Sequence, residues 1–166
     1  MRILVTGAAG FIGSNLVKAI FKRMDDAKVI GIDNLSDYYD LRLKHDRLTE
    51  LEEFSDFTFI RGSIADKPLV DRVFDEFKPQ IVVNLAAQAS ARCSLTNPGA
   101  YIESNIIGFY NILEACRHSY DQYDGGVRHL VYASSSSVYG SNKKVPYSTD
   151  DKVDNPVSLY AATKKS

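Results

Sequence analysis

Residues 2–13 read RILVTGAAGFIG, a short apolar run followed by glycines at every third position. The apolar run is uninterrupted, as in a buried strand, and residues 11–23 have the periodicity of an amphipathic helix. Gly7, Gly10 and Gly13 therefore lie in a strand-to-helix turn. Glycines there let the backbone turn tightly and approach a pyrophosphate, while the helix N-terminus offers unpaired N–H groups to the anion. The pattern predicts a dinucleotide site.

Asp33 lies 20 residues after Gly13, at the end of a second apolar run over 29–32. Its carboxylate can accept hydrogen bonds from the adenosine ribose diol of NAD, and it would repel the 2′-phosphate of NADP. No arginine directly follows Asp33, so the usual partner of that phosphate is missing. The sequence predicts NAD as the cofactor. The alternative is that the glycines only allow tight packing and that Asp33 is a turn residue.

Apolar runs alternate with helix-period segments along the chain. Strands are expected at 2–5, 29–32, 57–60, 81–83 and 129–132. Helices are expected at 11–23, at 41–54, from Pro68 to about Phe77, from Asn97 and Pro98 to about Arg117, and from Pro156 or Val157 onward. Residues 140–155 are polar and should form a loop. Five strands separated by helices predict an α/β fold with a doubly wound parallel sheet, of the Rossmann type.

The composition indicates one globular domain with small-molecule or protein partners. The 166 residues are 45% hydrophobic and 25% charged, and a net charge of −1 gives no broad attraction to nucleic acid or to an anionic membrane. Cys93 and Cys116 show no zinc-type spacing, so no metal site is predicted, and reduced cysteines fit a cytoplasmic protein. No apolar run is long enough for a signal peptide or a membrane span.

Tyr160 and Lys164 are four residues apart, about one helical turn, and would share a helix face. A cation there favours the phenolate over the phenol and makes the tyrosine a usable base near neutral pH. Residues 134–137 are all serine and follow the strand expected at 129–132, where α/β sheets bind ligands. The alternatives are a solvated Tyr/Lys pair and a serine-rich turn.

Four stretches extend these patterns: DNLSDYYD at 33–40, NLAAQ at 84–88, ASSSSVYG at 133–140 and SLYAATKK at 158–165. With the glycine triple, they make the chain resemble the extended short-chain dehydrogenase/reductase family over its whole length. Within that family it is most similar to the UDP-glucuronate 4-epimerases of bacterial polysaccharide biosynthesis. The resemblance implies an NAD-dependent isomerase that converts UDP-glucuronate to UDP-galacturonate, or acts on a related UDP-hexose, through a transient 4-keto sugar.

The resemblance also implies roles for individual residues. Tyr160 would take the proton of the sugar C4 hydroxyl, and Lys164 would hold the nicotinamide ribose. Ser135 would hydrogen-bond the sugar O4, with Ser134 and Ser136 as alternatives in register. These assignments give a catalytic set of Ser135, Tyr160 and Lys164, of which the last two also contact the cofactor.

Further cofactor positions follow from the same resemblance. They are Gly7, Gly10, Phe11, Ile12 and Gly13 at the pyrophosphate, Asp33 and Asn34 at the ribose, Ser63 and Ile64 at the adenine, Leu85, Ala86 and Ala87 along the cofactor, and Asn105 at its nicotinamide half. Phe11, Ile12 and Leu85 could instead be ordinary core residues.

Two positions depart from the family pattern, and two more distinguish the chain from related enzymes. Ser63 stands where the family usually has Asp bonded to the adenine amino group, so adenine binding should be weaker. Cys93 stands where these epimerases commonly have Tyr, next to Arg92, a candidate contact for an anionic sugar. Related dehydratases and decarboxylases carry Glu, or Asp and Glu, directly before Val-Tyr-Gly, where this chain has Ser136 and Ser137. Without that acid, water elimination lacks its proton donor, which favours epimerisation.

Chains of this family continue for about as long again beyond the position of Ser166. We therefore expect residues 1–166 to be an incomplete, C-terminally truncated NAD-binding domain, with the substrate-binding domain absent. This stretch alone should show little or no epimerase activity, and the family's homodimer is called into question because one of its two interface helices is cut short. The alternative is a non-catalytic NAD-binding module or a truncated gene product.

Overall fold

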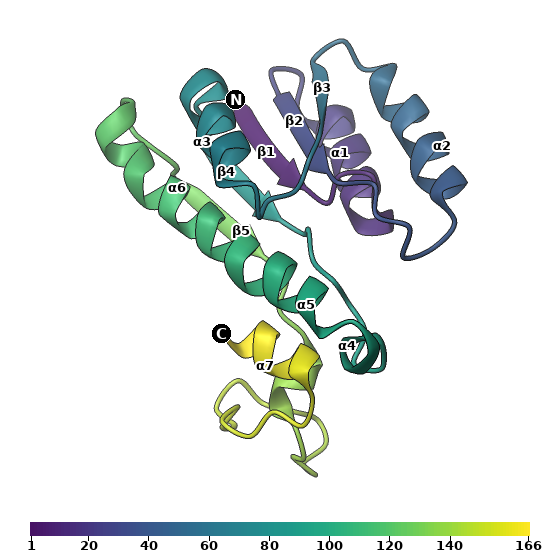
Figure 1. The fold of residues 1–166 in the computed structure, drawn as a ribbon. Coiled ribbons are helices and arrows are strands. Elements are labelled where there is room, and N and C mark those ends of the chain that lie inside the picture. Colours follow the sequence, from purple (N-terminus) through teal and green to yellow (C-terminus); the bar gives the residue numbers. More distant parts are fainter.

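Five parallel strands form a single sheet in the computed structural model, which describes residues 1–166 (Figure 1). The strands are β1 (Arg2–Thr6), β2 (Lys28–Asp33), β3 (Phe57–Arg61), β4 (Ile81–Asn84) and β5 (His129–Tyr132). Their order is β3-β2-β1-β4-β5. The strands β2 and β3 are added on one side of β1, and β4 and β5 are added on the other side, so the order of strands switches between β1 and β4. This order is that of a doubly wound, Rossmann-like sheet and confirms the predicted fold class.

Helices cover both faces of the sheet (Figure 1). They are α1 (Phe11–Arg23), α2 (Leu41–Glu52), α3 (Lys67–Phe77), α4 (Cys93–Thr96), α5 (Pro98–Tyr101), a π-helical segment η1 (Ile102–Gly108), α6 (Phe109–Gln122), a 3₁₀ turn η2 (Ser136–Tyr139) and α7 (Leu159–Lys165). Because side chains alternate along a strand, Val5 of β1 packs with Val17 of α1, whereas Leu4 packs with Val70 of α3 and Ile112 of α6.

Several helix boundaries differ from the predictions. The last helix begins at Leu159, because the Ser158 hydroxyl accepts a hydrogen bond from Ala161 N (3.0 Å) and caps it. The helix predicted from Asn97 to about Arg117 runs on to Gln122, contains the π-helical segment, and is preceded by the unpredicted α4. The second helix ends at Glu52 instead of Phe54, and part of the serine run forms η2.

The sheet is unevenly covered. In β2, all residues after Lys28 are buried, whereas β5 has no buried residue, and its Val131 and Tyr132 side chains are 44% and 56% exposed. β5 pairs only with β4, so it forms one edge of the sheet.

None of the helices combines the length and the apolar character needed to cross a bilayer.

Candidate functional site

The turn between β1 and α1 requires glycine at two positions. Gly7 has φ of +69°, and a Cβ there would lie 2.9 Å from the backbone nitrogen of Ala86. A Cβ on Gly13 would overlap the carbonyl oxygen of Gly7. The turn is therefore closed by backbone atoms that leave no room for side chains.

The N-terminus of α1 is open to a ligand. Its first intrahelical hydrogen bond runs from Ser14 N to Gly10 O (3.0 Å), so the preceding N–H groups of Phe11, Ile12 and Gly13 have no partner within the helix. The Phe11 and Ile12 side chains are 70% and 66% exposed, which excludes the alternative that they are core residues.

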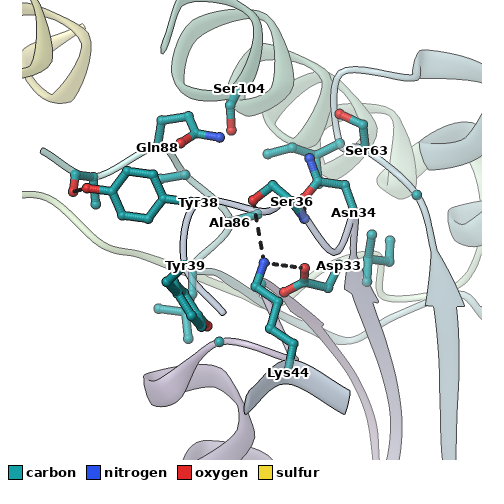
Figure 2. Close-up of a pocket in the computed structure, with 18 residues that line it drawn as sticks. Asp33, Asn34, Ser36, Tyr38, Tyr39, Lys44, Ser63, Ala86, Gln88 and Ser104 are labelled. Carbon is teal, nitrogen blue, oxygen red and sulfur yellow. Dashed lines mark hydrogen bonds and ion pairs between the residues drawn. The ribbon is translucent and has the colours of Figure 1, made fainter. Parts of the chain in front are cut away.

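A pocket of about 200 Å³ lies beside this turn, at the carboxyl ends of β1 to β4 (Figure 2). This is the place where open α/β sheets bind ligands, on both sides of the reversal between β1 and β4. We call it the cofactor pocket. Nine of the predicted cofactor-binding residues line it: Gly7, Gly10, Asp33, Asn34, Ser63, Ile64, Leu85, Ala86 and Ala87.

Asp33 is buried at the end of β2 and is held by its own chain. Its Oδ1 accepts from Leu35 N (2.8 Å) and from Lys44 Nζ (3.1 Å), and its Oδ2 accepts from Ala9 N (3.2 Å). The carboxylate thus ties β2 to the glycine turn and to α2. Asn34 beside it is exposed, and its side chain accepts from Ser36 N (3.0 Å), which shapes the loop after β2.

The pocket also contains residues that sequence reasoning missed. Ser36, Tyr38, Tyr39, Lys44, Gln88 and Ser104 line it (Figure 2). Lys44 had a signal in the sequence, because it lies on the same helical face as Leu48 and Leu51, the other buried residues of α2. A lysine within an apolar stripe needs a buried acidic partner, and Asp33 was a candidate because it ends a predicted buried strand.

Thr6 was missed as well, although it organises the wall of the pocket. Its hydroxyl donates to Asn84 Oδ1 (2.6 Å) and accepts from Leu85 N (3.1 Å) and Ala86 N (3.0 Å). The end of β1 thereby fixes the backbone that follows β4. Thr6 is fully buried, so this network is shielded from water.

A second pocket, of about 210 Å³, adjoins the first, because Ala86 lines both. Asn105, Ser134 and Lys164 are among its lining residues, but Ser135 and Tyr160 are not. The Ser135 hydroxyl caps η2 by accepting from Ser137 N (3.2 Å). Of the candidate serines 134, 135 and 136, Ser134 is the one that lines this second pocket.

Lys164 and Tyr160 both lie on α7, as predicted, but their side chains have different partners. Lys164 Nζ donates to the backbone carbonyl of Ala133 (2.9 Å), and burial lowers the pKa of Lys164 from its ordinary value of 10.5. The Tyr160 hydroxyl makes no hydrogen bond, and its ring packs edge-on against Tyr101 with 6.2 Å between ring centroids. The lysine therefore anchors α7 to the end of β5.

Asn105 connects the loop after β4 with α7. Its side chain accepts from Gln88 N (2.8 Å) and donates to Gln88 O (2.9 Å) and to Thr163 Oγ1 (3.0 Å). Thr163 lies between Tyr160 and Lys164 in the sequence, so this amide positions the predicted catalytic helix. Its predicted contact with the nicotinamide half of a cofactor stays a prediction.

A family model described as the NAD dependent epimerase/dehydratase family matches residues 3–166. The chain belongs to this family. The epimerase/dehydratase chain is 50% identical to Protein CapI of Staphylococcus aureus and 48% identical to UDP-glucuronate 4-epimerase 2 of Arabidopsis thaliana. These matches cover 100% and 99% of the chain, but only 47% and 36% of the relatives.

Solved structures agree with this relationship. The epimerase/dehydratase chain matches UDP-glucuronic acid 4-epimerase from Bacillus cereus, crystallised with UDP-glucuronic acid and NAD, with a TM-score of 0.84 and 33% identity. The match covers 99% of this chain and 49% of that protein. The chain thus spans less than half the length of these relatives.

Its structure contains no group of three or more His, Cys, Asp or Glu residues placed to hold a metal ion.

Proposed function

We propose that this chain is the NAD-binding part of a nucleotide-sugar 4-epimerase of the UDP-glucuronate type. The main support is that the cofactor pocket adjoins, through Ala86, the pocket lined by Lys164. A cofactor-binding site and the predicted catalytic helix therefore meet at the carboxyl edge of one sheet.

The residues present fit NAD. Gly7 and Gly13 make a turn that a Cβ would fill, which leaves room for a pyrophosphate against the backbone. The free N–H groups at the start of α1 suit that anion, and Asp33 lies where an adenosine ribose would meet β2. Ser63 and Ile64 line the end of the pocket that we assign to the adenine.

NAD, when bound, supplies the acceptor and donor for a hydride at the sugar C4. We assign to Tyr160 the removal and return of the proton of the sugar C4 hydroxyl. The Tyr160 hydroxyl is available for this role because it makes no hydrogen bond to another group of the chain. Lys164, which we assign to the nicotinamide ribose, lies one helical turn away on the same helix α7. Ser135, or Ser134 in the alternative register, would hydrogen-bond the C4 oxygen.

Epimerisation is favoured over dehydration and decarboxylation by the residues before Val138. Ser136 and Ser137 form the first turn of η2, and neither can donate a proton as a carboxylic acid would. For the substrate, the names of the relatives support UDP-glucuronate, and the exposed Arg92 is a candidate partner for its carboxylate.

The remaining parts of the proposal rest on the resemblance. They are a role in polysaccharide biosynthesis, a cytoplasmic location, and the assignment of residues 1–166 to an NAD-binding domain. A homodimer formed through the long helix 98–122 is also proposed from the resemblance.

A non-catalytic NAD-binding module is the second candidate. The exposed edge strand β5 supports it, since this strand holds the adjoining Ser135 less firmly than the sheet centre holds the cofactor pocket. Both candidate functions include NAD binding, but only the epimerase converts a nucleotide-sugar substrate.

The test is expression of the gene with any coding sequence that continues in frame beyond codon 166, followed by incubation with UDP-glucuronate and NAD, separation of the products and mass spectrometry. A 4-epimer of unchanged mass supports the epimerase, and a lighter product shows dehydration or decarboxylation. Binding of NAD without any product supports the module. Absence of NAD binding in calorimetry would contradict both.

A further inference from the structure

A buried ion pair between Lys44 and Asp33 lies inside the cofactor pocket (Figure 2). The two side chains are 7% and 6% exposed, and Lys44 Nζ lies 3.1 Å from Asp33 Oδ1. Burial of an ammonium costs hydration that one ion pair restores only in part, so such a pair is weak evidence for stabilisation. Its position at the wall of a ligand pocket points instead to a role in binding.

The hydrogen-bonding capacity of Asp33 is nearly used up. Oδ1 already accepts from Leu35 N and Lys44 Nζ, and Oδ2 accepts from Ala9 N. A carboxylate offers about four lone-pair sites, so about one remains, on Oδ2. A ribose diol presents two hydroxyl groups, and the second one needs another partner.

Lys44 can be that partner. Its ammonium has three N–H donors. One donates to Asp33, and a second faces Ser36 Oγ at 3.5 Å, the outer limit for a hydrogen bond. At least one donor is left, and Lys44 and Ser36 both line the pocket.

We propose that Lys44 acts with Asp33 to determine cofactor selectivity. Lys44 donates to one oxygen of the adenosine ribose, and Asp33 Oδ2 accepts from one hydroxyl. The ammonium also offsets the charge of the carboxylate, so a 2′-phosphate meets a nearly neutral pair instead of a bare anion. The degree of preference for NAD over NADP is then set by both residues. This inference rests on the proposed NAD binding.

Calorimetry with ADP-ribose and 2′-phospho-ADP-ribose tests the proposal, because neither ligand needs the nicotinamide half of the site. In the Lys44→Gln variant of the 166-residue chain, ADP-ribose should bind about tenfold more weakly, through loss of a charged hydrogen bond. The phosphorylated ligand should lose about 100-fold or more, because the Asp33 charge is no longer offset. In Asp33→Asn, the preference should shift at least about tenfold toward the phosphorylated ligand.

Lys18→Gln is the matched control. Lys18 pairs with Glu50 Oε2 (2.6 Å) between α1 and α2, and neither residue lines the cofactor pocket. This variant removes the same charge from the same face of the sheet and should leave both affinities within about twofold of the wild type.

The outcomes separate this inference from the proposed function. Wild-type protein that binds no ADP-ribose would contradict the NAD site itself. Wild-type binding with a Lys44→Gln variant that behaves like Lys18→Gln would overturn the role of Lys44 alone. If a single variant fails to fold, as circular dichroism would show, the uncharged double variant Asp33→Asn/Lys44→Met replaces it. Discrimination between the two ligands should then nearly vanish, and wild-type discrimination would overturn the proposal.

Discussion

The cofactor pocket and the C-terminal segment from β5 to α7 are built in different ways. The pocket stands on β1, β2 and β4, and its wall is fixed by the buried side chains of Thr6 and Asp33. In contrast, of the 42 buried residues only Ala161 and Thr163 lie beyond residue 127. The first region owes its geometry to a packed core, whereas the second depends on a few hydrogen bonds. A residue in the pocket should therefore affect binding, and one in the C-terminal segment should affect local order.

The largest effect is expected from Gly13→Ala. The new Cβ would overlap the Gly7 carbonyl oxygen and meet further backbone atoms, so the turn must shift. We expect NAD affinity to fall by about 100-fold, or roughly 2.7 kcal/mol, and the protein to lose about 1–3 kcal/mol of stability through overpacking. Calorimetry and thermal unfolding measure both quantities.

Gly99→Ala is the control for this change. A Cβ on Gly99 would meet nothing within 4 Å, and Gly99 lies in the helix α5. The free energy of unfolding of the Gly99→Ala variant should stay within about 1 kcal/mol of the wild-type value, and its NAD affinity should be unchanged. Equal effects of both substitutions would break the assignment of the glycine turn to the cofactor.

A pair of asparagine variants should separate the two regions. Asn105→Ala removes the side chain that links Gln88 to Thr163, so α7 should loosen by about 1–3 kcal/mol, seen as about tenfold or faster amide exchange in that helix. ADP-ribose affinity should change by less than about threefold, because the Asn105 side chain is absent from the wall of the cofactor pocket.

Asn111→Ala is the matched comparison. Asn111 donates to the carbonyls of Ile64 and Ala65, next to the end of the pocket assigned to the adenine. This variant should weaken ADP-ribose binding by about three- to tenfold and leave exchange in α7 unchanged. Identical exchange profiles for both variants would show that the two regions are one cooperative unit.

The lysine on α7 should produce a smaller, pH-dependent effect. Because burial lowers the pKa of Lys164 in the folded chain, the unfolded chain binds more protons between that lowered pKa and 10.5. The wild type should gain stability relative to Lys164→Met as pH rises through this window, by at most about 1.4 kcal/mol per pH unit. Urea unfolding of both proteins between pH 7 and about 10.5 measures the difference. A constant difference would show that Lys164 is fully solvated.

The smallest effect concerns Ser63, whose hydroxyl accepts from Ala65 N (3.1 Å). In Ser63→Asp, a carboxylate could accept from the adenine amino group more strongly than the hydroxyl does. ADP-ribose should bind about three- to tenfold more tightly, whereas Ser63→Ala should bind no better than the wild type. An aspartate variant with unchanged affinity would place the adenine elsewhere in the pocket.

Local sequence rules predicted the sheet well. All five strands were found within two residues of their predicted bounds, because continuous apolar runs have few alternatives once both faces are covered. The helix boundaries were less accurate. A cap such as Ser158 and a change to π-helical turns within 102–108 depend on contacts that periodicity does not contain.

The site was predicted in part, and the division has a physical reason. The glycine turn and Asp33 were predictable because the spacing of strand, turn and helix is local in sequence. Thr6 and Lys44 were missed, since their roles depend on partners from other elements, such as the backbone after β4 and the carboxylate at the end of β2.

The sequence by itself determined the order of strands and helices, the turn that can hold a pyrophosphate, and the family. The tertiary structure decided which groups share a pocket, that Asp33 is already paired with Lys44, and that Lys164 bonds to the end of β5 instead of lying free. Backbone preferences and apolar periodicity act over a few residues, so the amino-acid sequence alone reveals them. Burial and charge pairing arise only when distant segments meet, and these set the chemistry of the site.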